Sequence, residues 1–478
     1  MSENILKQAQ KIHFIGIGGI GISAIARMLL LEGKIITGSD RDETKVTEEL
    51  RKAGAKIIIG QKKENVPEEC DLVIYTVAIP ETDAEFMEVK RRQIPMLTYP
   101  QTLNIISKEK YTIAVSGTHG KTTVTAMVAK VMIDAGLDPT VIVGSLIHRP
   151  VQQTGHPSLE KEGEADTNFI MGKSKYLVVE ADEYKKSFHN LEPSILVINN
   201  LDEDHLDFYK DLADIQDSFL HLAKKLPKDG FLICNTKLPN LQPIIHNVGC
   251  KVIDYSEIEL KEKLLVPGEH NRQNAKTAFA VAKVLHIDLK KTKKSLTQFT
   301  GTWRRFEYKG KTKSGALVYD DYAHNPQKVR AALQGAREMF PDRRIVVVFQ
   351  PHLFSRTKLL LNEFATAFGD ADEIILTPIF PAREVFDPGI SSEILAEKIS
   401  LHHLEPTPAP SQGRGSKSPS FGGGFRRGSA DKAVVSVLSF PDFDSIISYL
   451  QSSLGPSDLL ITMGAGEQYK IGEALLTR

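Results

Sequence analysis

The stretch that most constrains this chain is residues 111–123, YTIAVSGTHGKTT. Its first residues are mostly apolar, with β-branched members, and predict a buried strand. Gly117 and Gly120 then turn the backbone, and Lys121 opens a helix that we expect to run to Ala135. A strand, a glycine-containing turn and a lysine at a helix start form a cradle for phosphate, because backbone N–H groups and the helix dipole face the anion. The stretch therefore predicts an α/β protein that binds a phosphorylated ligand.

Two side chains of this cradle have predicted roles. Lys121 would reach the β- and γ-phosphates of a nucleotide, and Thr122 would offer its hydroxyl to Mg²⁺. The full phosphate-loop pattern has a further glycine at the position where this chain has Val115. A glycine-bearing strand–helix turn with an incidental lysine is therefore the alternative interpretation.

Length and composition limit the classes of function. The chain has 478 residues, which is typical of about three domains. Its formal net charge is zero, so nothing global favours nucleic acid or an acidic membrane surface as a partner. Three widely spaced cysteines predict neither a disulfide framework nor a metal cluster and favour a reducing cytoplasm. The polar first residues and the lack of an apolar run of about 18 residues predict no signal peptide and no membrane span.

A glycine-rich turn organises the first predicted domain, residues 1–107. The strand Lys11–Ile17 runs into residues 16–21, GIGGIG, and Asp40 follows the next strand. This arrangement is typical of dinucleotide-binding units, and the extra Gly19 leaves more bare backbone N–H for a diphosphate. The turn therefore predicts a nucleotide site at the carboxyl edge of a first sheet.

Strands and helices alternate through the rest of the chain. The alternation predicts mostly parallel, doubly wound sheets, with a central domain over residues 108–300 and a third domain over 301–478. Residues 150–166 lack periodicity and are expected to be an exposed insertion. Residues 402–432 are dominated by Pro, Gly, Ser and Arg and predict a disordered insertion, for which RNA binding stays open as an alternative.

Polar residues follow two strands of the central domain. Glu180 comes directly after residues 176–179, and His205 comes in the loop after residues 195–198. Because Mg²⁺ binds hard oxygen ligands together with substrate phosphates, we expect this edge of the sheet to hold metal. A solvated strand-end acid and a structural loop histidine are the alternatives.

A loop and helix start near His270 predicts base recognition. Asn271 and Asn274 lie three residues apart, on one face of a helix. Their amides offer a donor and an acceptor to an adenine edge, whereas a single asparagine there would only cap the helix.

Charged residues of the third domain predict anion contacts. Arg304 and Arg305 are either solvated or bidentate partners of a phosphate. Residues 320–325, DDYAHN, and 350–356, QPHLFSR, end neighbouring strands and would form an anion site. Isolated buried histidines and surface arginines are the alternative.

Eight motifs, in order, resemble those of the Mur ligases and cover essentially the whole chain apart from the two insertions. They are GIGGIGIS (16–23), GTHGKTT (117–123), EADEY (180–184), DEDHLD (202–207), PGEHNRQNA (267–275), WRRFE (303–307), DDYAH (320–324) and QPHLFSRT (350–357).

The resemblance implies a UDP-binding Rossmann-like domain, a central ATPase-type domain and a C-terminal Rossmann-like domain that closes over an amino acid. It is strongest to the alanine-adding branch. It therefore implies that L-alanine is joined to UDP-N-acetylmuramate, with ATP and Mg²⁺, by a cytoplasmic monomer or weak dimer. In that chemistry the muramate carboxylate takes the γ-phosphate of ATP, and the amine of L-alanine then displaces phosphate from the acyl phosphate.

The resemblance also implies roles for individual residues. The UDP-sugar would meet Gly16, Gly18, Gly19, Gly21, Ser39, Asp40 and Ala78. ATP would meet Gly117, Thr118, His119, Gly120, Lys121, Thr122, Thr123, His270, Asn271, Asn274, Arg305 and Asp321. Metal would be held by Thr122, Glu180 and His205. The catalytic set would be Lys121, Glu180, His205, His324, His352 and Arg356, of which the last three face the amino acid.

The chain departs from the family pattern at three places. Asn325 stands where a second histidine is frequent, and residues 168–170, Asn-Phe-Ile, replace a usual Asn-Ala-Arg. Leu220 stands where other Mur ligases carry a carbamylated lysine that the alanine-adding branch lacks.

Alternative functions follow from other features. Residues 98–101, TYPQ, and 199–201, NNL, resemble the branch that recycles murein tripeptide. A non-catalytic nucleotide sensor would be expected to have lost Lys121, Glu180 or His205, which are all present. A nicotinamide dehydrogenase would leave the phosphate loop unexplained.

Overall fold

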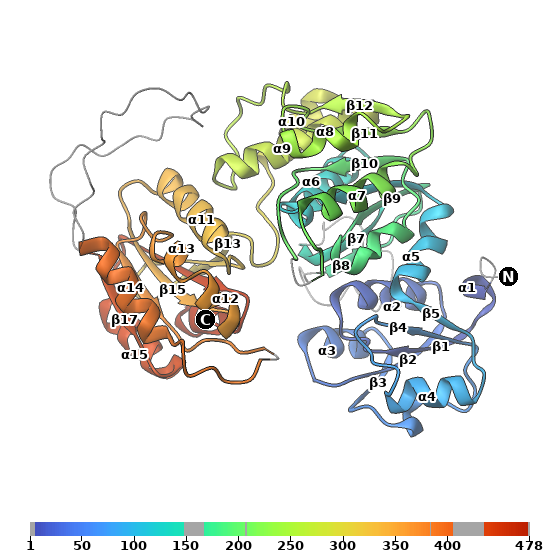
Figure 1. The fold of residues 1–478 in the computed structure, drawn as a ribbon, viewed down its shortest axis with the longest axis horizontal. Coiled ribbons are helices and arrows are strands. Elements are labelled where there is room, and N and C mark those ends of the chain that lie inside the picture. The colour runs from blue at the N-terminus through green and yellow to red at the C-terminus, as the bar shows by residue number, and fades with distance from the viewer. Residues whose placement is uncertain (1–4, 148–166, 206–207, 383, 405–434, 477–478) are drawn as a thin grey trace. The chain divides into compact units, whose positions relative to one another are not determined.

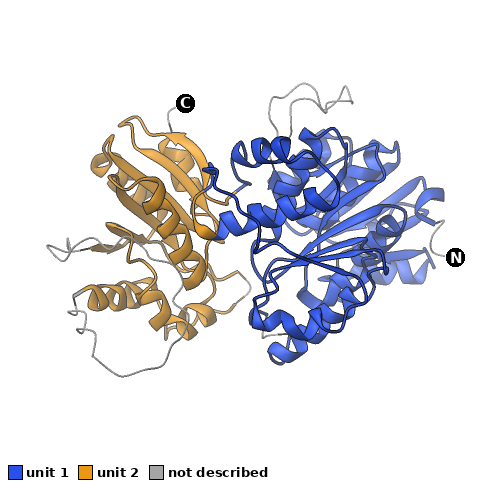
Figure 2. Ribbon diagram, turned by 90° about the horizontal axis from the view of Figure 1, so that it is seen from above, with its two compact units in different colours: residues 1–266, 270–303 blue, residues 267–269, 304–478 orange. Residues whose placement is uncertain are grey.

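The computed structural model describes residues 5–147, 167–205, 208–382, 384–404 and 435–476 (Figure 1). It divides into two compact units, residues 1–266 with 270–303 and residues 267–269 with 304–478 (Figure 2). The first unit carries two sheets and the second unit carries one. The predicted insertion at 150–166 and most of the one at 402–432 lie outside the described residues.

Five parallel strands form the first sheet, in the order β3-β2-β1-β4-β5. The strands are β1 (Lys11–Ile15), β2 (Ile35–Asp40), β3 (Lys56–Ile59), β4 (Leu72–Tyr75) and β5 (Met96–Thr98). The helices are α1 (Ile5–Gln8), α2 (Ile20–Leu31), α3 (Lys45–Lys52), η1 (Lys63–Asn65), α4 (Ala84–Arg91) and α5 (Tyr99–Lys108). The strand order reverses between β1 and β4, so the turn after β1 and the loop after β4 open at the ligand edge of the sheet.

Seven strands form the second sheet, in the order β12-β11-β10-β6-β9-β7-β8. They are β6 (Tyr111–Ser116), β7 (Thr140–Ile147), β8 (Thr167–Ile170), β9 (Tyr176–Glu180), β10 (Ile195–Ile198), β11 (Phe231–Cys234) and β12 (Lys251–Asp254). The helices are α6 (Lys121–Asp134), η2 (Tyr184–Asn190), α7 (Leu212–Ala223), η3 (Pro239–Leu241), α8 (Gln242–Ile245), α9 (Glu269–Val284) and α10 (Leu289–Thr297). Strand β8 runs antiparallel to β7, and the other neighbouring pairs are parallel.

A continuous apolar core joins the first two sheets. It includes Phe14 of β1 and Ile25 of α2 from the first domain, and Phe169 of β8 and Leu177 of β9 from the second. Helix α2 packs against β7 and β8, so the segment that follows the glycine-rich turn is fixed by the central domain. Burial of such apolar residues is the main favourable term that holds the two sheets together.

The third sheet has the order β13-β14-β18-β15-β16-β17, with β13 antiparallel to β14 and the other pairs parallel. Its strands are β13 (Glu307–Lys311), β14 (Leu317–Asp321), β15 (Arg344–Gln350), β16 (Glu373–Leu376), β17 (Ser436–Ser439) and β18 (Asp458–Gly464). Its helices are α11 (Pro326–Met339), α12 (Phe354–Leu359), α13 (Leu361–Ala365), α14 (Ser392–Leu404), α15 (Phe443–Ser453) and α16 (Tyr469–Leu475). Residues 402–404, which the sequence assigned to the insertion, are the last residues of α14.

The predicted fold class is confirmed, because the chain forms three successive α/β sheets that are mostly parallel. No described helix has both the length and the apolar character that crossing a membrane requires. Cys70, Cys234 and Cys250 are unpaired.

Candidate active site

The phosphate loop lies at the carboxyl end of β6, in the middle of the second sheet. Strand β6 ends at Ser116, residues 117–120 turn, and α6 begins at Lys121. Gly120 precedes the helix with a left-handed φ of +81°, and a Cβ added there would lie 2.5 Å from Asn274 Oδ1. Glycine is therefore required at this position. Because glycine has no side chain to cap the helix, the first turn of α6 leaves its N–H groups for an anion.

Lys121 reaches back over the loop. Its ammonium group donates hydrogen bonds to the Gly117 carbonyl oxygen (2.9 Å) and to Glu183 Oε1 (2.8 Å). Burial alone would lower the pKa of Lys121, but the carboxylates of Glu183 and Asp182 outweigh it and raise the pKa. The amine is therefore charged at neutral pH, as a phosphate-binding lysine must be.

Thr122 and Glu180 contact each other beside the loop. Thr122 Oγ1 donates to Glu180 Oε1 (3.0 Å), and the Gly144 N–H donates to Glu180 Oε2 (2.7 Å). Burial raises the pKa of Glu180, although Lys121 and these donors oppose it. A cation added here would be favourable, because it would offset the cost of burying the carboxylate.

The structure groups His205 with two other carboxylates. One ligand atom each from Asp182, Glu183 and His205 lie within 4.8 Å of one another, and His205 Nε2 is 3.7 Å from Glu183 Oε1. Glu183 Oε2 is buried without a hydrogen-bond partner in the described part of the chain, and burial raises the pKa of this carboxyl. The set fits a divalent cation. From the EADEY segment, only Glu180 was predicted as a metal ligand, and Asp182 and Glu183 were missed.

The loop after β10 supports the phosphate loop through an amide that sequence reasoning also missed. Asn200 Oδ1 accepts a hydrogen bond from the His119 N–H (2.7 Å), and Asn200 Nδ2 donates to the His119 carbonyl oxygen (3.1 Å). The Asn200 carbonyl oxygen accepts from the Thr118 N–H (3.1 Å). These bonds fix the backbone of two residues that were predicted to meet ATP. No periodicity marks such a residue, because the contact joins two distant loops.

Asn271 and Asn274 contact each other on one face of α9, in agreement with their spacing. Asn274 Nδ2 donates to Asn271 Oδ1 (3.2 Å), and Asn199 Nδ2 donates to Asn274 Oδ1 (2.9 Å). Asn199 Oδ1 in turn accepts from the Thr277 hydroxyl (2.8 Å). These buried amides therefore brace the phosphate loop. Their contact with adenine, and that of His270 at the helix start, stay predictions.

The glycine-rich turn of the first domain closes against Asp40. The Gly18 N–H donates to Asp40 Oδ2 (2.7 Å), and a Cβ on Gly18 would lie 2.9 Å from that atom. Ser39 is fully buried, its hydroxyl donates to Glu85 Oε2 (2.7 Å), and its carbonyl oxygen accepts two N–H groups of the turn. Ser39 thus supports the turn through its backbone. UDP contacts here and at Ala78 stay predictions.

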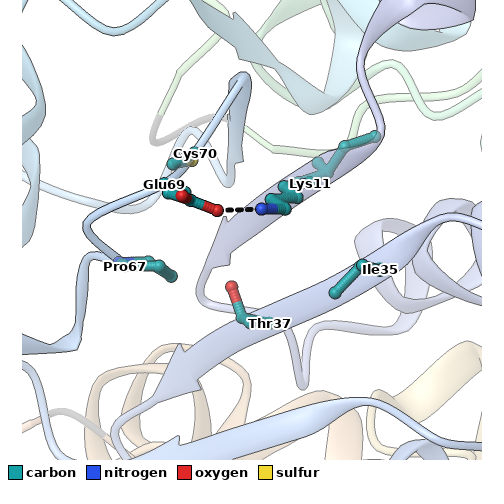
Figure 3. Close-up of a pocket in the computed structure, with 7 residues that line it drawn as sticks. Lys11, Ile35, Thr37, Pro67, Glu69 and Cys70 are labelled. Atoms are coloured by element: carbon teal, nitrogen blue, oxygen red, sulfur yellow. Dashed lines mark hydrogen bonds and ion pairs between the residues drawn. The ribbon is translucent and has the colours of Figure 1, made fainter.

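A cavity of about 270 Å³ lies at the opposite edge of the same sheet (Figure 3). Its lining includes Lys11 and Ile35, which begin β1 and β2, together with Pro67 and Cys70. Lys11 forms an exposed ion pair with Glu69 across it (Figure 3). Because ligands of open α/β sheets bind at the carboxyl edge, this cavity is not part of the nucleotide site.

In the second unit, His352 and Arg356 contact each other and His324 lies near them. Arg356 Nη1 is 2.9 Å from His352 Nδ1, and the two imidazole rings are 6.0 Å apart. Burial and the Arg356 charge lower the pKa of His352 to about 4, and burial also lowers the pKa of His324. Since a guanidinium only donates, His352 Nδ1 is the acceptor and Nε2 carries the proton. A neutral donor thus lies beside a fixed positive charge.

Arg304 is buried and bonded within the third domain, so the interpretation of it as a solvated residue was wrong. Its Nε donates to Asp320 Oδ2 (2.8 Å), and its Nη atoms donate to two carbonyl oxygens at and just after the end of β18. Burial raises the pKa of Asp320 to about 6, against the opposing Arg304 charge. Arg305 is partly exposed, with its guanidinium 5.2 Å from the Tyr322 ring.

Asp321 and Asn325 hold the loop between β14 and α11. Asp321 accepts hydrogen bonds from the Phe306 and Ala323 N–H groups, each at 2.7 Å. Asn325 caps α11 by accepting from the Lys328 N–H (2.9 Å), so asparagine has a structural role at this position. An ATP contact of Asp321 stays a prediction.

The site combines a phosphate loop and its lysine with two sets of side chains that can bind a cation. Buried amides support the loop. These features define a protein that binds and activates a nucleotide phosphate. Three family models match the chain. They are the Mur ligase family catalytic domain over residues 11–111, the Mur ligase middle domain over 115–264 and the Mur ligase glutamate ligase domain over 304–466. The chain belongs to the Mur ligase family.

Relatives and solved structures agree with this assignment. The chain is 39% identical to the UDP-N-acetylmuramate–L-alanine ligase of Clostridium kluyveri over the full length of both chains. It is 38% identical to the enzyme of that name from Lachnospira eligens, over 97% of each chain. A crystal structure of UDP-N-acetylmuramate-alanine ligase from Thermotoga maritima matches with a TM-score of 0.75 and 26% identity, and covers 97% of this chain and 98% of that one.

Proposed function

We propose that this chain is an ATP-dependent ligase that joins L-alanine to UDP-N-acetylmuramate. The observation that carries the proposal is the sequence identity of 39%, over the full length of both chains, to a relative of that name. The geometry of the phosphate loop supports it, because a charged Lys121 and the open first turn of α6 together suit the phosphates of ATP.

The proposed reaction depends on positioning and charge neutralisation rather than on a protein nucleophile. The muramoyl carboxylate takes the γ-phosphoryl group of ATP, and ADP leaves. The amine of L-alanine then attacks the carbonyl carbon of the acyl phosphate, and inorganic phosphate leaves. Lys121 would hold the transferred phosphoryl group. Arg356 would pair with the alanine carboxylate, because a guanidinium binds a carboxylate strongly.

Mg²⁺ is part of the proposal, and the residues present fit it. Thr122 and Glu180 offer hard oxygen atoms on α6 and β9. Asp182, Glu183 and His205 offer a second set, in which Glu183 Oε2 has no hydrogen-bond partner among the described residues. Mg²⁺ bound there would neutralise charge on the phosphates.

A ligase that recycles murein tripeptide is the alternative. A murein peptide ligase structure from Psychrobacter arcticus matches with a TM-score of 0.64 but only 22% identity, so it supports the fold alone. The short TYPQ and NNL segments are the only features described above that favour this activity.

The test is phosphate release from ATP and Mg²⁺ with UDP-N-acetylmuramate, with the amine varied. L-alanine should support turnover, whereas the tripeptide L-Ala-γ-D-Glu-meso-diaminopimelate should not. Turnover with the tripeptide alone would overturn the proposal. Lys121→Met should abolish turnover. Lys130→Met is the matched control, because Lys130 pairs with Asp134 near the far end of the same helix.

A further inference from the structure

Tyr99 has a fixed position at the carboxyl edge of the first sheet. It is the first residue of α5, directly after β5. The helix start is locked by a capping box, in which the Gln101 N–H donates to Thr98 Oγ1 (3.2 Å) and the Thr98 N–H donates to Gln101 Oε1 (2.8 Å). The Tyr99 side chain therefore leaves a backbone that has little freedom to move.

The Tyr99 ring lies against the first turn of α2, which follows the glycine-rich turn. A Cβ added to Gly21 would lie 2.6 Å from Tyr99 Cζ and 2.7 Å from its hydroxyl oxygen. Any other residue at position 21 would push this ring away. The last glycine of the GIGGIG motif thus admits the tyrosine hydroxyl to the edge where the nucleotide-sugar is proposed to bind.

The same turn is also held by the central domain. Asn168 of β8 is fully buried, and its Nδ2 donates to the Ser23 hydroxyl (2.8 Å) and to the Ile20 carbonyl oxygen. Tyr99 and Asn168 therefore contact a turn whose position relative to the second sheet is fixed within the first unit.

The Tyr99 hydroxyl is a hydrogen-bond donor near the carboxylates of the central domain. Burial raises its pKa, and the charges of Glu180 and Asp182 raise it further, so the phenol stays protonated and lies within the electrostatic reach of the metal-competent side chains. No described residue forms a hydrogen bond with this hydroxyl. A partly buried phenol in this position gains most from an anionic acceptor supplied by a ligand.

We propose that the Tyr99 hydroxyl donates a hydrogen bond to an anionic oxygen of the bound UDP-N-acetylmuramate, either on the diphosphate or on the lactyl carboxylate. The inference rests on the proposed function. That substrate must extend from the glycine-rich turn to the phosphate loop, because its carboxylate receives the γ-phosphoryl group. The Tyr99 ring lies against Gly21 at one end of this route, and the charges of Glu180 and Asp182 in the central domain raise the pKa of its hydroxyl.

The test compares Tyr99→Phe with Tyr111→Phe in the full-length chain. Both changes remove one hydroxyl. Tyr111, however, is the first residue of β6 and so lies at the amino edge of the second sheet, away from the phosphate loop. Tyr99→Phe should raise the KM for UDP-N-acetylmuramate about tenfold, as expected for loss of one hydrogen bond to a charged group. The KM values for ATP and L-alanine and the melting temperature should not change. Tyr111→Phe should behave as the unchanged chain.

Binding measurements without ATP then locate the acceptor. If Tyr99→Phe weakens both UDP-N-acetylglucosamine and UDP-N-acetylmuramate, the acceptor is the diphosphate. If it weakens only UDP-N-acetylmuramate, the acceptor is the lactyl carboxylate. Equal affinities of the two proteins for both ligands would overturn the inference while leaving the proposed function intact. Failure of the unchanged chain to bind UDP-N-acetylmuramate would overturn both.

Discussion

Asn200→Ala should impair ATP use while leaving the protein folded. The side chain makes two hydrogen bonds to the His119 backbone, at 2.7 and 3.1 Å. The backbone N and O atoms of Asn200 also lie 3.1 and 3.0 Å from where a Cβ of Gly117 would be. The loop after β10 is therefore a template against which the phosphate loop rests. Removing the Asn200 amide deletes the two hydrogen bonds that hold the His119 backbone in the middle of the phosphate loop.

The expected magnitude follows from the two bonds. Each contributes about 1 kcal/mol net, so their loss amounts to about 2 kcal/mol. If the phosphate loop must recover its shape before binding ATP, kcat/KM for ATP should fall about 30-fold, since 1.4 kcal/mol corresponds to about a factor of 10. The effect belongs to the ATP side of the reaction, so the KM for L-alanine should stay the same.

The assay is steady-state phosphate release with ATP titrated at saturating co-substrates, together with a thermal unfolding scan. Asn247→Ala is the matched control, because its amide donates one hydrogen bond to the Pro243 carbonyl oxygen (2.8 Å) at an exposed site. An Asn200→Ala protein with unchanged kcat/KM for ATP would refute the reasoning. So would an equal loss in the Asn247→Ala control.

Three further outcomes are expected. Asp320→Asn should lower the free energy of unfolding in urea by about 3–5 kcal/mol, because it leaves the buried charge of Arg304 uncompensated. Thr462→Val, which removes one hydrogen bond to Asp320, should lower it by only about 1 kcal/mol, and equal losses would contradict the prediction. The pKa of His352 is about 4 in the folded chain against an ordinary 6.5, so the unfolded state binds more protons between these values and stability falls as pH drops through that window. The melting temperature of His352→Gln should therefore fall less between pH 7 and pH 5 than that of the unchanged chain. An identical fall would contradict a lowered pKa of His352. EDTA should stop phosphate release and Mg²⁺ should restore it, whereas turnover in EDTA would exclude the proposed metal role.

The sequence by itself determined the local features of this protein. The strand, glycine turn and helix of residues 111–123 are contiguous, so composition and spacing were enough to predict β6, the turn and α6. The same holds for the glycine-rich turn after β1 and for the i, i+3 contact between Asn271 and Asn274. Alternation of strands and helices was enough for the fold class.

The tertiary structure decided which side chains meet. The strand order β10-β6-β9 places two strands that are neighbours in the chain on either side of β6, so their end loops flank the phosphate loop from opposite sides. That order, and not the spacing along the chain, pairs Lys121 with Glu183 and sets Asn200 against His119. The tertiary structure also decided which charged residues are buried. Arg304 is an example, because its charge favours an exposed position when only the sequence is considered. Periodicity reports only which face of an element is buried, whereas these contacts depend on strand order and loop path, which are fixed by packing over the whole chain.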